Sequence, residues 1–364
     1  MNTTIRKKIF LNISEIASFI GKNPYDSVTP FQRLWKRYDP EGYNTALNHL
    51  NTQILDSEVK MGIFEQQRAD LEKDLETKRI TKRQFTARLN KIEKESCQVK
   101  DQIADLTERI DNIQLTKEQQ VEKALGKEVT SQIRDAAIET DTKRETTNKI
   151  INALDVSDTQ KSKLKHKAEN IINTSHGTIK EDSAIAQFEK KYKVKLDTSQ
   201  VYHTRSFYAT PQIDWIIGGK VDGLFLGNNR SESFVVEVKN RTKAFFNTLR
   251  DYEKCQIQLY IWMLDLEQAK LVEKCGERIR VTVIYRDQDF LEEIFECLRM
   301  FTFSYTSKFL SDAELKIKFL NGSDEEKKII LNKLYLSDIT RFVNELFEER
   351  TKRSEEECLV DDLD

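Results

Sequence analysis

The sequence lacks the features that would tie it to a membrane or to secretion. Its 364 residues contain no apolar run of about 18 residues, the length that a membrane-crossing helix needs. The N-terminal stretch also lacks the apolar core of a signal peptide. We therefore expect an intracellular protein without a membrane partner.

Paired cysteines and an excess of charge of one sign are missing as well. The five cysteines are an odd number without CxxC or Cys/His spacing, which argues against a disulfide framework and against a zinc site. Lysine and arginine number 59 and aspartate and glutamate 61, a formal net charge of −2. The global charge does not indicate a nucleic-acid partner, so binding to one would need a local basic patch.

Proline is absent from residues 41–210 and glycine is scarce there, which favours long helices. Within this region apolar residues recur at alternating steps of four and three, interrupted only by Ser96: Phe85, Leu89, Ile92, Ser96, Val99, Ile103, Leu106, Ile110 and Ile113. Such heptads predict an antiparallel coiled-coil hairpin with arms at about 50–79 and 82–115. Thr81 is placed to cap the second arm.

The remaining chain has the signals of a mixed α/β fold. Thr116 and Gln119 have the spacing of a capping box, and Gly126 marks a break between helices. A helix is expected from Thr178 to about Tyr192, and the tail should be helical from Ser311 onward and acidic at its end. Three strands and one helix are expected in between, the strands at 215–221, 234–238 and 280–285 and the helix at about 251–266.

One strand end carries an unusual combination of charges. Alternate residues of a strand share a face, so Glu237 and Lys239 point the same way. Asp222 ends the preceding strand, just before Gly223 turns the chain, and its carboxylate could converge with that of Glu237. Paired carboxylates suit Mg²⁺ or Mn²⁺, and a neighbouring lysine can stabilise negative charge on a phosphate. A salt bridge between two surface strands is the simpler alternative.

The spacing Asp-x14-Glu-x-Lys resembles the PD-(D/E)XK nuclease superfamily. Three further features resemble the lambda-exonuclease and YqaJ-like viral recombinase family, in the form found in large DNA viruses. They are Gln256 and Tyr260 in "CQIQLYIWM", the pair Gly177 and Glu181, and the N-terminal stretch "ISEIASFIGKNPYDS". The resemblance covers roughly residues 1–43 and 175–290.

This resemblance implies an α/β (α+β) fold with a restriction-endonuclease-like core, in which helices flank a central mixed sheet, and a long antiparallel coiled-coil or helical insertion. The division that it implies has four parts: residues 1–43 as the N-terminal part of the nuclease domain, 44–173 as a helical insertion with the hairpin at about 50–115, 174–310 as the catalytic core, and 311–364 as a C-terminal helical segment with an acidic tail.

The resemblance also implies roles for the matching residues. Glu181, Asp222, Glu237 and the carbonyl of Val238 would bind Mg²⁺ or Mn²⁺, with Asp222 and Glu237 essential for catalysis. Lys239 would be the catalytic lysine, Gln256 would orient Lys239 or the nucleophilic water, and Tyr260 would support Gln256. The implied activity is a 5′–3′ exonuclease on linear duplex DNA in recombination, repair or replication. An endonuclease or nickase of the same fold, and an inactive core that serves as a coiled-coil DNA-binding assembly factor, remain as alternatives.

DNA contacts are expected from two sources. The resemblance implies contacts by Ser14, Lys7, Asn240 and Arg241. In the basic run at 161–167, Lys161 and Lys165 stand four residues apart, and their repulsion on a helix would be relieved by a polyanion, although such a run also suits a solvated face. The expected partners are duplex DNA ends, a second copy of the chain, and a protein that binds the coiled coil. The resemblance places the protein in the cytoplasm or at a viral replication site of an infected cell.

Overall fold

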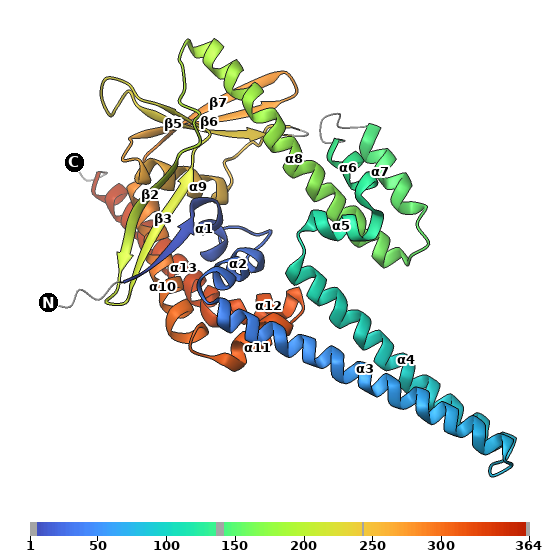
Figure 1. Cartoon of the computed structure of the whole chain (residues 1–364). Helices are drawn as coiled ribbons and strands as arrows, with labels where there is room; N and C mark the ends of the chain where they lie inside the picture. Colours follow the sequence, from blue (N-terminus) through green and yellow to red (C-terminus); the bar gives the residue numbers. More distant parts are fainter. Residues whose placement is uncertain (1–5, 136–141, 242–243, 362–364) are drawn as a thin grey trace.

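The structure, a computed structural model, describes residues 6–135, 142–241 and 244–361. Its described strands form two sheets (Figure 1). The first has the order β1-β3-β2, and its strands are β1 (Lys7–Asn12), β2 (Tyr202–Ala209) and β3 (Ile213–Lys220). The second has the order β4-β5-β6-β7, and its strands are β4 (Gly223–Phe225), β5 (Phe234–Asn240), β6 (Gln268–Cys275) and β7 (Arg278–Tyr285).

The two sheets are connected by a single continuous stretch of chain. Only Val221 and Asp222 separate β3 from β4, so the chain passes from one sheet into the other at Asp222. In the second sheet β5 runs parallel to β6, while β4 and β7 are antiparallel to their neighbours. The predicted fold class, a mixed α/β core with a long helical insertion, is confirmed, but the central sheet is divided in two at this point.

Helices cover both faces of the second sheet. On one face α8 (Asp158–Tyr192) packs Ile185 and Phe188 against Val236 and Val238 of β5. On the other face Val235 belongs to the larger core together with α9 (Asp251–Met263). The helices α1 (Ile13–Phe19) and α10 (Gln288–Ser304) pack against α9 in turn. The face that carries Glu237 and Lys239 is therefore covered by α9.

The N- and C-terminal segments share one aromatic core. Phe31 of α2 (Val28–Tyr38) contacts the rings of Phe301, Phe309 and Phe319, which lie on C-terminal helices. Phe301 lies on α10, and the segments that follow it are the π-helical turns η1 (Tyr305–Phe309) and η2 (Asn332–Leu336) and the helices α11 (Ala313–Asn321), α12 (Asp324–Leu331) and α13 (Ser337–Asp361). The cap of α11 is Asp312 and not the predicted Ser311, because Asp312 accepts from the backbone N–H of Leu315 whereas the Ser311 hydroxyl donates back to the carbonyl of Ser307.

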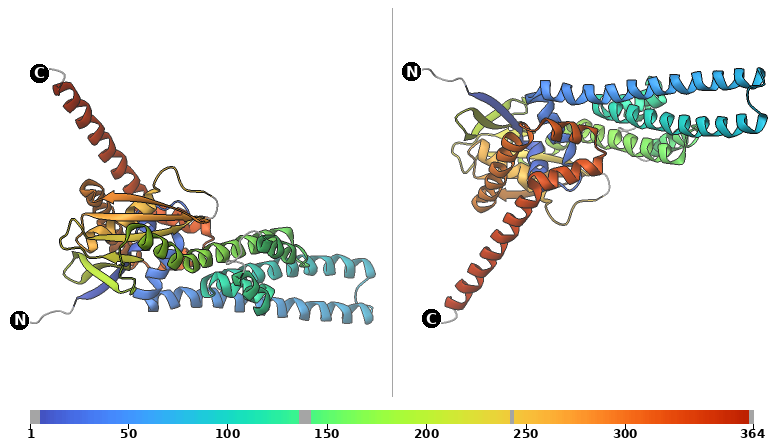
Figure 2. Two further views of the ribbon diagram at one scale, coloured as in Figure 1. Left: turned by 90° about the horizontal axis from the view of Figure 1, so that it is seen from above. Right: turned by 90° about the horizontal axis from the view of Figure 1, so that it is seen from below.

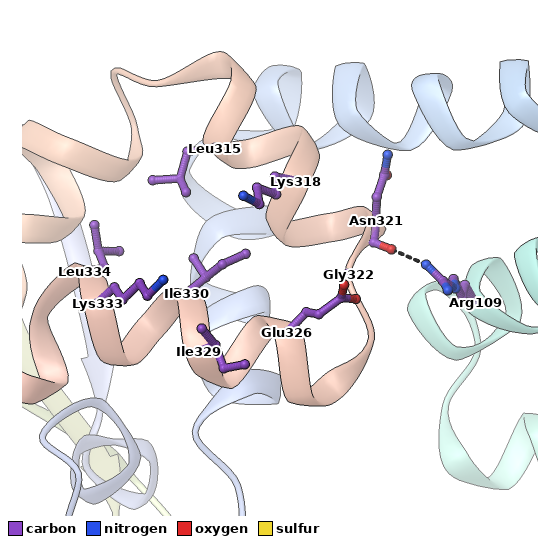
Figure 3. A pocket seen from close by; sticks show the side chains of 10 residues that line it. All are labelled: Arg109, Leu315, Lys318, Asn321, Gly322, Glu326, Ile329, Ile330, Lys333 and Leu334. Carbon is purple, nitrogen blue, oxygen red and sulfur yellow. Dashed lines mark hydrogen bonds between the residues drawn. The ribbon is translucent and has the colours of Figure 1, made fainter.

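Two long antiparallel helices project from this body (Figure 2). They are α3 (Pro40–Glu76) and α4 (Lys82–Gln114), and they pack against each other. Thr81 caps α4 in a complete capping box with Gln84. All nine residues of the predicted seam are half-buried or buried. Near the body the hairpin joins the main core through Leu50 and Leu106.

A small helical unit follows the hairpin. It consists of α5 (Lys117–Leu125), α6 (Lys127–Asp135), α7 (Thr142–Asn152) and the first half of α8, which share a separate apolar core around Val121, Ile133 and Ile151. Gly126 ends α5 with φ 85°, a left-handed conformation that favours glycine. The capping box of Thr116 and Gln119 is present.

The predicted start of a helix at Thr178 is wrong, because α8 begins at Asp158 and runs through Gly177. A single glycine costs a helix only about 1 kcal/mol, and α8 is anchored in a hydrophobic core at each end. The strands predicted at 215–221, 234–238 and 280–285 correspond to β3, β5 and β7, whereas β1, β2, β4 and β6 were not predicted as separate strands. Among the residues described, no helix is both long and apolar enough to cross a membrane.

The outer half of the hairpin should be dispensable for folding. We predict that removing two heptads from each arm, residues 63–76 and 82–95, leaves the melting temperature within a few degrees of wild type. The shortened chain keeps the turn and joins Thr81 to Ser96, so that Gln98 replaces Gln84 as the capping-box partner.

Leu106→Ala is the control, because Leu106 belongs to the main core. It should lower the free energy of unfolding by about 2–5 kcal/mol in denaturant titrations. A shortened hairpin that unfolds as readily as Leu106→Ala would show that the outer arms stabilise the body.

Candidate active site

A chain of polar contacts runs from the end of β5 to α9. The Nζ atom of Lys239 lies 2.7 Å from Oε1 of Glu237 and 3.2 Å from Oε1 of Gln256. The Nε2 atom of Gln256 lies 3.3 Å from the hydroxyl of Tyr260. Strand alternation puts Glu237 and Lys239 on one face, and helical spacing puts Gln256 above Tyr260. Two local periodicities thus bring four of the predicted residues into contact.

Asp222 approaches this site from the junction between the two sheets. Its Oδ2 atom accepts a hydrogen bond of 2.7 Å from the backbone N–H of Val238. The pairing of β4 with β5 ends at Gly223 and Val236, so the Asp222 side chain takes the place of a strand partner for Val238. The N–H and C=O of one strand residue point to the same side, which directs the Val238 carbonyl toward Asp222 as well.

Glu181 reaches the same region from α8. Gln200 donates a hydrogen bond of 3.3 Å to its carboxylate. Burial raises the pKa of Glu181, and the negative charge of Glu237 raises it further. Glu181 and Glu237 therefore belong to one electrostatic cluster, although they come from opposite faces of the second sheet.

The cluster carries more negative charge than its lysine neutralises. Burial, followed by the charges of Glu237 and Glu181, raises the pKa of Asp222 to about 8. Burial alone would lower the pKa of Lys239, but the charge and hydrogen bond of Glu237 outweigh it and the net pKa is raised. Glu237 is only 3% exposed, and its second oxygen, Oε2, is buried without a hydrogen-bond partner. Such a site favours an additional cation.

The donor set suits a hard divalent cation. Within the described part of the chain, no three Asp, Glu, His or Cys side chains form a complete ligand group. Mg²⁺ needs fewer, because it is usually held by one or two carboxylates and keeps several waters. The Oε2 atom of Glu237 has no hydrogen-bond partner, and the hydrogen bond from Val238 uses Oδ2 of Asp222 and not Oδ1. The residues present therefore fit such an ion.

Two adjacent glycines that we did not single out from the sequence make room for this arrangement. A Cβ atom on Gly219 would lie 3.1 Å from the Tyr260 ring, and one on Gly218 would lie 2.8 Å from the Tyr202 ring. The hydroxyl of Tyr202 in turn donates to the Asn12 side chain, 2.9 Å away. Paired glycines inside a strand are the signal that could have identified this close approach.

Arg241 lies in a different setting from the one expected of a DNA contact. Its guanidinium makes a bidentate pair with Glu253, at 2.7 and 2.9 Å, and a third bond of 2.9 Å to Glu273. The side chain is only 9% exposed. Burial would lower its pKa, but the hydrogen bonds to Glu253 outweigh burial and the pKa is raised. Arg241 thus ties the end of β5 to α9 and β6.

The other expected DNA contacts lie at varying distances from the cluster. Ser14 is exposed on α1, and Asn240 is the last residue of β5. Lys7 begins β1, at the end of that strand far from Asn12, and its ammonium contacts the carbonyl of Tyr38. Lys161 and Lys165 lie on the first half of α8, within the small helical unit.

Arg241→Ala should destabilise the fold. The change removes the positive charge that pairs with the buried carboxylates of Glu253 and Glu273. We therefore expect the free energy of unfolding to fall by about 3–5 kcal/mol. Arg299→Ala, which removes an exposed pair with Glu296, should cost no more than about 1 kcal/mol. Denaturant titrations measure both. A stable Arg241→Ala protein would show that Arg241 is not a structural clamp.

Asp222→Asn should stabilise the protein at neutral pH in the presence of a chelator. The folded-state pKa of Asp222 is raised from 3.8 to about 8, so its contribution to stability is present below pH 4 and lost as the pH rises through 8. Asparagine keeps the acceptor for Val238 without the charge. One pKa unit corresponds to about 1.4 kcal/mol, so we expect a gain of at least about 1 kcal/mol at pH 8.

Asp287→Asn should show the opposite sign. Burial would raise the pKa of Asp287, but the hydrogen bond from Lys254 outweighs it and the pKa is lowered. Ionised Asp287 therefore contributes to the free energy of unfolding at neutral pH, and this contribution is lost on acidification. Thermal melts from pH 4 to 9 compare the variants. If Asp222→Asn is no more stable than wild type at pH 8, the carboxylates do not repel one another in the folded state.

Comparison with known proteins adds a family to this geometry. Residues 122–267 match the model of the YqaJ-like viral recombinase domain. No curated protein matches the chain. Similar solved structures are the crystal structure of SSO0001, with 19% identity over 41% of this chain and 70% of that one and a TM-score of 0.30, and the alkaline exonuclease LHK-Exo of Laribacter hongkongensis, with 14% identity over 52% and 89% and a TM-score of 0.28.

The complex of LHK-Exo with dAMP gives similar values, with 15% identity and a TM-score of 0.27. The residues that match the family model include Glu181, Asp222, Glu237 and Lys239, together with Gln256 and Tyr260. The match starts within α5, earlier than the resemblance noted in the sequence, and it does not include residues 1–43. The resemblance predicted from the sequence is confirmed by this match of residues 122–267 to the YqaJ-like viral recombinase domain.

Proposed function

We propose that the protein is a divalent-metal-dependent deoxyribonuclease. The single observation that supports this most is the contact chain Glu237–Lys239–Gln256, with Asp222 bonded to the backbone of Val238 beside it. A buried acceptor without a partner can bind a metal ion, and an ammonium held at a fixed position can stabilise charge on a phosphate, so both suit the hydrolysis of a phosphodiester.

Glu237, Asp222 and the Val238 carbonyl would hold the ion, and Glu181 would join them from α8. A divalent cation bound there supplies charge neutralisation at the phosphate and a more acidic water as nucleophile. Glu181 and Asp222 have raised pKa values without the ion, so binding of a cation would displace protons and favour their carboxylates.

Lys239 would stabilise the negative charge that develops on the phosphate. Its contact with Glu237 keeps it protonated, since the pKa is raised despite burial. Gln256 fixes the ammonium through its carbonyl oxygen, and its amide nitrogen is held by the Tyr260 hydroxyl. Burial raises the pKa of Tyr260, so this hydroxyl stays protonated and acts as a positioning group.

The finer proposal is a 5′–3′ exonuclease on linear duplex DNA, acting in recombination, repair or replication. It rests on the family resemblance of the N-terminal block, where Ser14 would contact a phosphate near the DNA end. Asn240, which follows the lysine on β5, would contact the same strand. Lys161 and Lys165 would contact duplex further away, and Lys7 is the weakest candidate because of its place on β1.

Incubation with linear, nicked and closed circular DNA, with and without Mg²⁺ or Mn²⁺, tests this proposal. We expect the metal-loaded wild type to degrade the linear duplex and to spare closed circles. Lys239→Ala and Glu237→Gln should each lower the cleavage rate by at least about 100-fold, because they remove a charge that stabilises the transition state or a carboxylate that holds the ion.

Lys254→Ala is a matched control, because Lys254 lies on α9 two residues from Gln256 but pairs with Asp287. It should cleave at close to the wild-type rate. Linearisation of closed circles would favour an endonuclease or nickase of the same fold. Binding of DNA without cleavage of any substrate would favour an inactive core that acts as a DNA clamp.

A further inference from the structure

An exposed tyrosine is held in place beside the candidate active site. Tyr25 is 74% exposed, the largest exposed fraction among the large hydrophobic residues of the described chain. Its backbone N–H donates to Oδ1 of Asn23, 3.0 Å away, and the amide of Asn23 is itself bonded to the buried Ser18. Backbone bonds from Lys22 and Asn23 to the carbonyl of Ala17 fix the loop to α1. The backbone that carries Tyr25 is therefore fixed by hydrogen bonds, although the side chain is exposed.

Tyr252 links this tyrosine to the site. The rings of Tyr25 and Tyr252 lie edge to face, with centroids 5.9 Å apart and planes at 78°. Tyr252 stands on the first turn of α9, four residues before Gln256 and eight before Tyr260, so the three side chains follow one face of the helix. That face is the one that contacts Lys239 through Gln256.

The geometry leaves a π-face available. In an edge-to-face pair, Tyr252 covers at most one face of the Tyr25 ring, and the high exposure shows that little else covers the other. A rigid, amphipathic ring with an open face is a surface on which a nucleobase can stack. Tyr252 is one helical turn from Gln256, which contacts Lys239, so the aromatic pair lies close to the candidate site.

We propose that Tyr25, supported by Tyr252, is a stacking platform for the base of a nucleotide next to the phosphate held at Lys239. This proposal rests on the proposed function. It implies that this base is either the outermost base of the duplex end, whose outer face is open, or a base that has left the stack, because both faces of an internal paired base are covered. It also implies little preference for the sequence at that position, because every base has a π-face.

A fluorescent base analogue tests stacking without cleavage. Short duplexes carry 2-aminopurine at the 5′-terminal or 3′-terminal position and are titrated with the full chain in the presence of a chelator, which prevents metal-dependent cleavage and keeps Lys239 in place. We expect quenching at one of these positions, loss of that quenching in Tyr25→Ala, and its retention in Tyr25→Trp. The dissociation constant should rise roughly tenfold in Tyr25→Ala, as for the loss of one stacked base.

Tyr285→Ala is the matched control. Tyr285 is 70% exposed, but it lies at the end of β7 that pairs with Gln268, far from the end of the sheet that carries Lys239. Its removal should change neither quenching nor affinity. A second control is an abasic site at the quenched position, which should weaken binding by the wild type and add nothing to the defect of Tyr25→Ala.

The outcomes separate the two proposals. Equal quenching by wild type and Tyr25→Ala, or equal weakening of intact and abasic duplexes by Tyr25→Ala, would overturn the stacking platform. If Tyr25 contacts a protein partner instead of a base, wild type and Tyr25→Ala will quench equally. Absence of metal-dependent cleavage in the wild type would overturn the proposed function instead, and the quenching experiment would still decide on stacking because it does not depend on turnover.

Discussion

The hydrogen bond between Asp222 and the backbone N–H of Val238 is the contact on which the candidate site depends. It forms where the chain leaves the first sheet and enters the second, and it occupies the edge of β5 that β4 leaves open. The same bond sets the position of a carboxylate beside Glu237 and directs the Val238 carbonyl toward it. Without this junction Glu237 on β5 would lack the neighbouring carboxylate of Asp222.

The layers around the junction explain why the charges can be kept there. Val236 and Val238 anchor β5 in the core against α8, and Val235 anchors it in the larger core with α9. Arg241, bonded to Glu253 and Glu273, holds the end of the strand between α9 and β6. These contacts fix the backbone firmly enough to hold buried carboxylates that repel one another. A cation would turn that repulsion into binding energy.

The helices outside the two sheets differ in how much of their apolar surface they share with the main core. The outer hairpin buries its own seam, whereas its base, through Leu50 and Leu106, is part of the main core. The small helical unit has its own apolar core but shares α8 with the core that packs against Val236 and Val238 of β5. A ligand that binds the first half of α8 is therefore connected to Glu181 by one continuous helix. The C-terminal helices close the aromatic core around Phe31, which makes them part of the body.

The sequence by itself determined what depends on local periodicity. The heptads predicted the two long helices, Thr81 and Thr116 predicted the caps of α4 and α5, and strand alternation predicted that Glu237 and Lys239 share a face. Only the tertiary structure decided what depends on contacts between distant segments. The burial of Arg241, the division of the sheet at Asp222 and the unbroken course of α8 through Gly177 follow from partners 12 or more residues away or from cores at both ends of an element. Tyr25 next to Tyr252 is such a contact too, because the aromatic pair joins residues 25 and 252, which only the folded chain brings together.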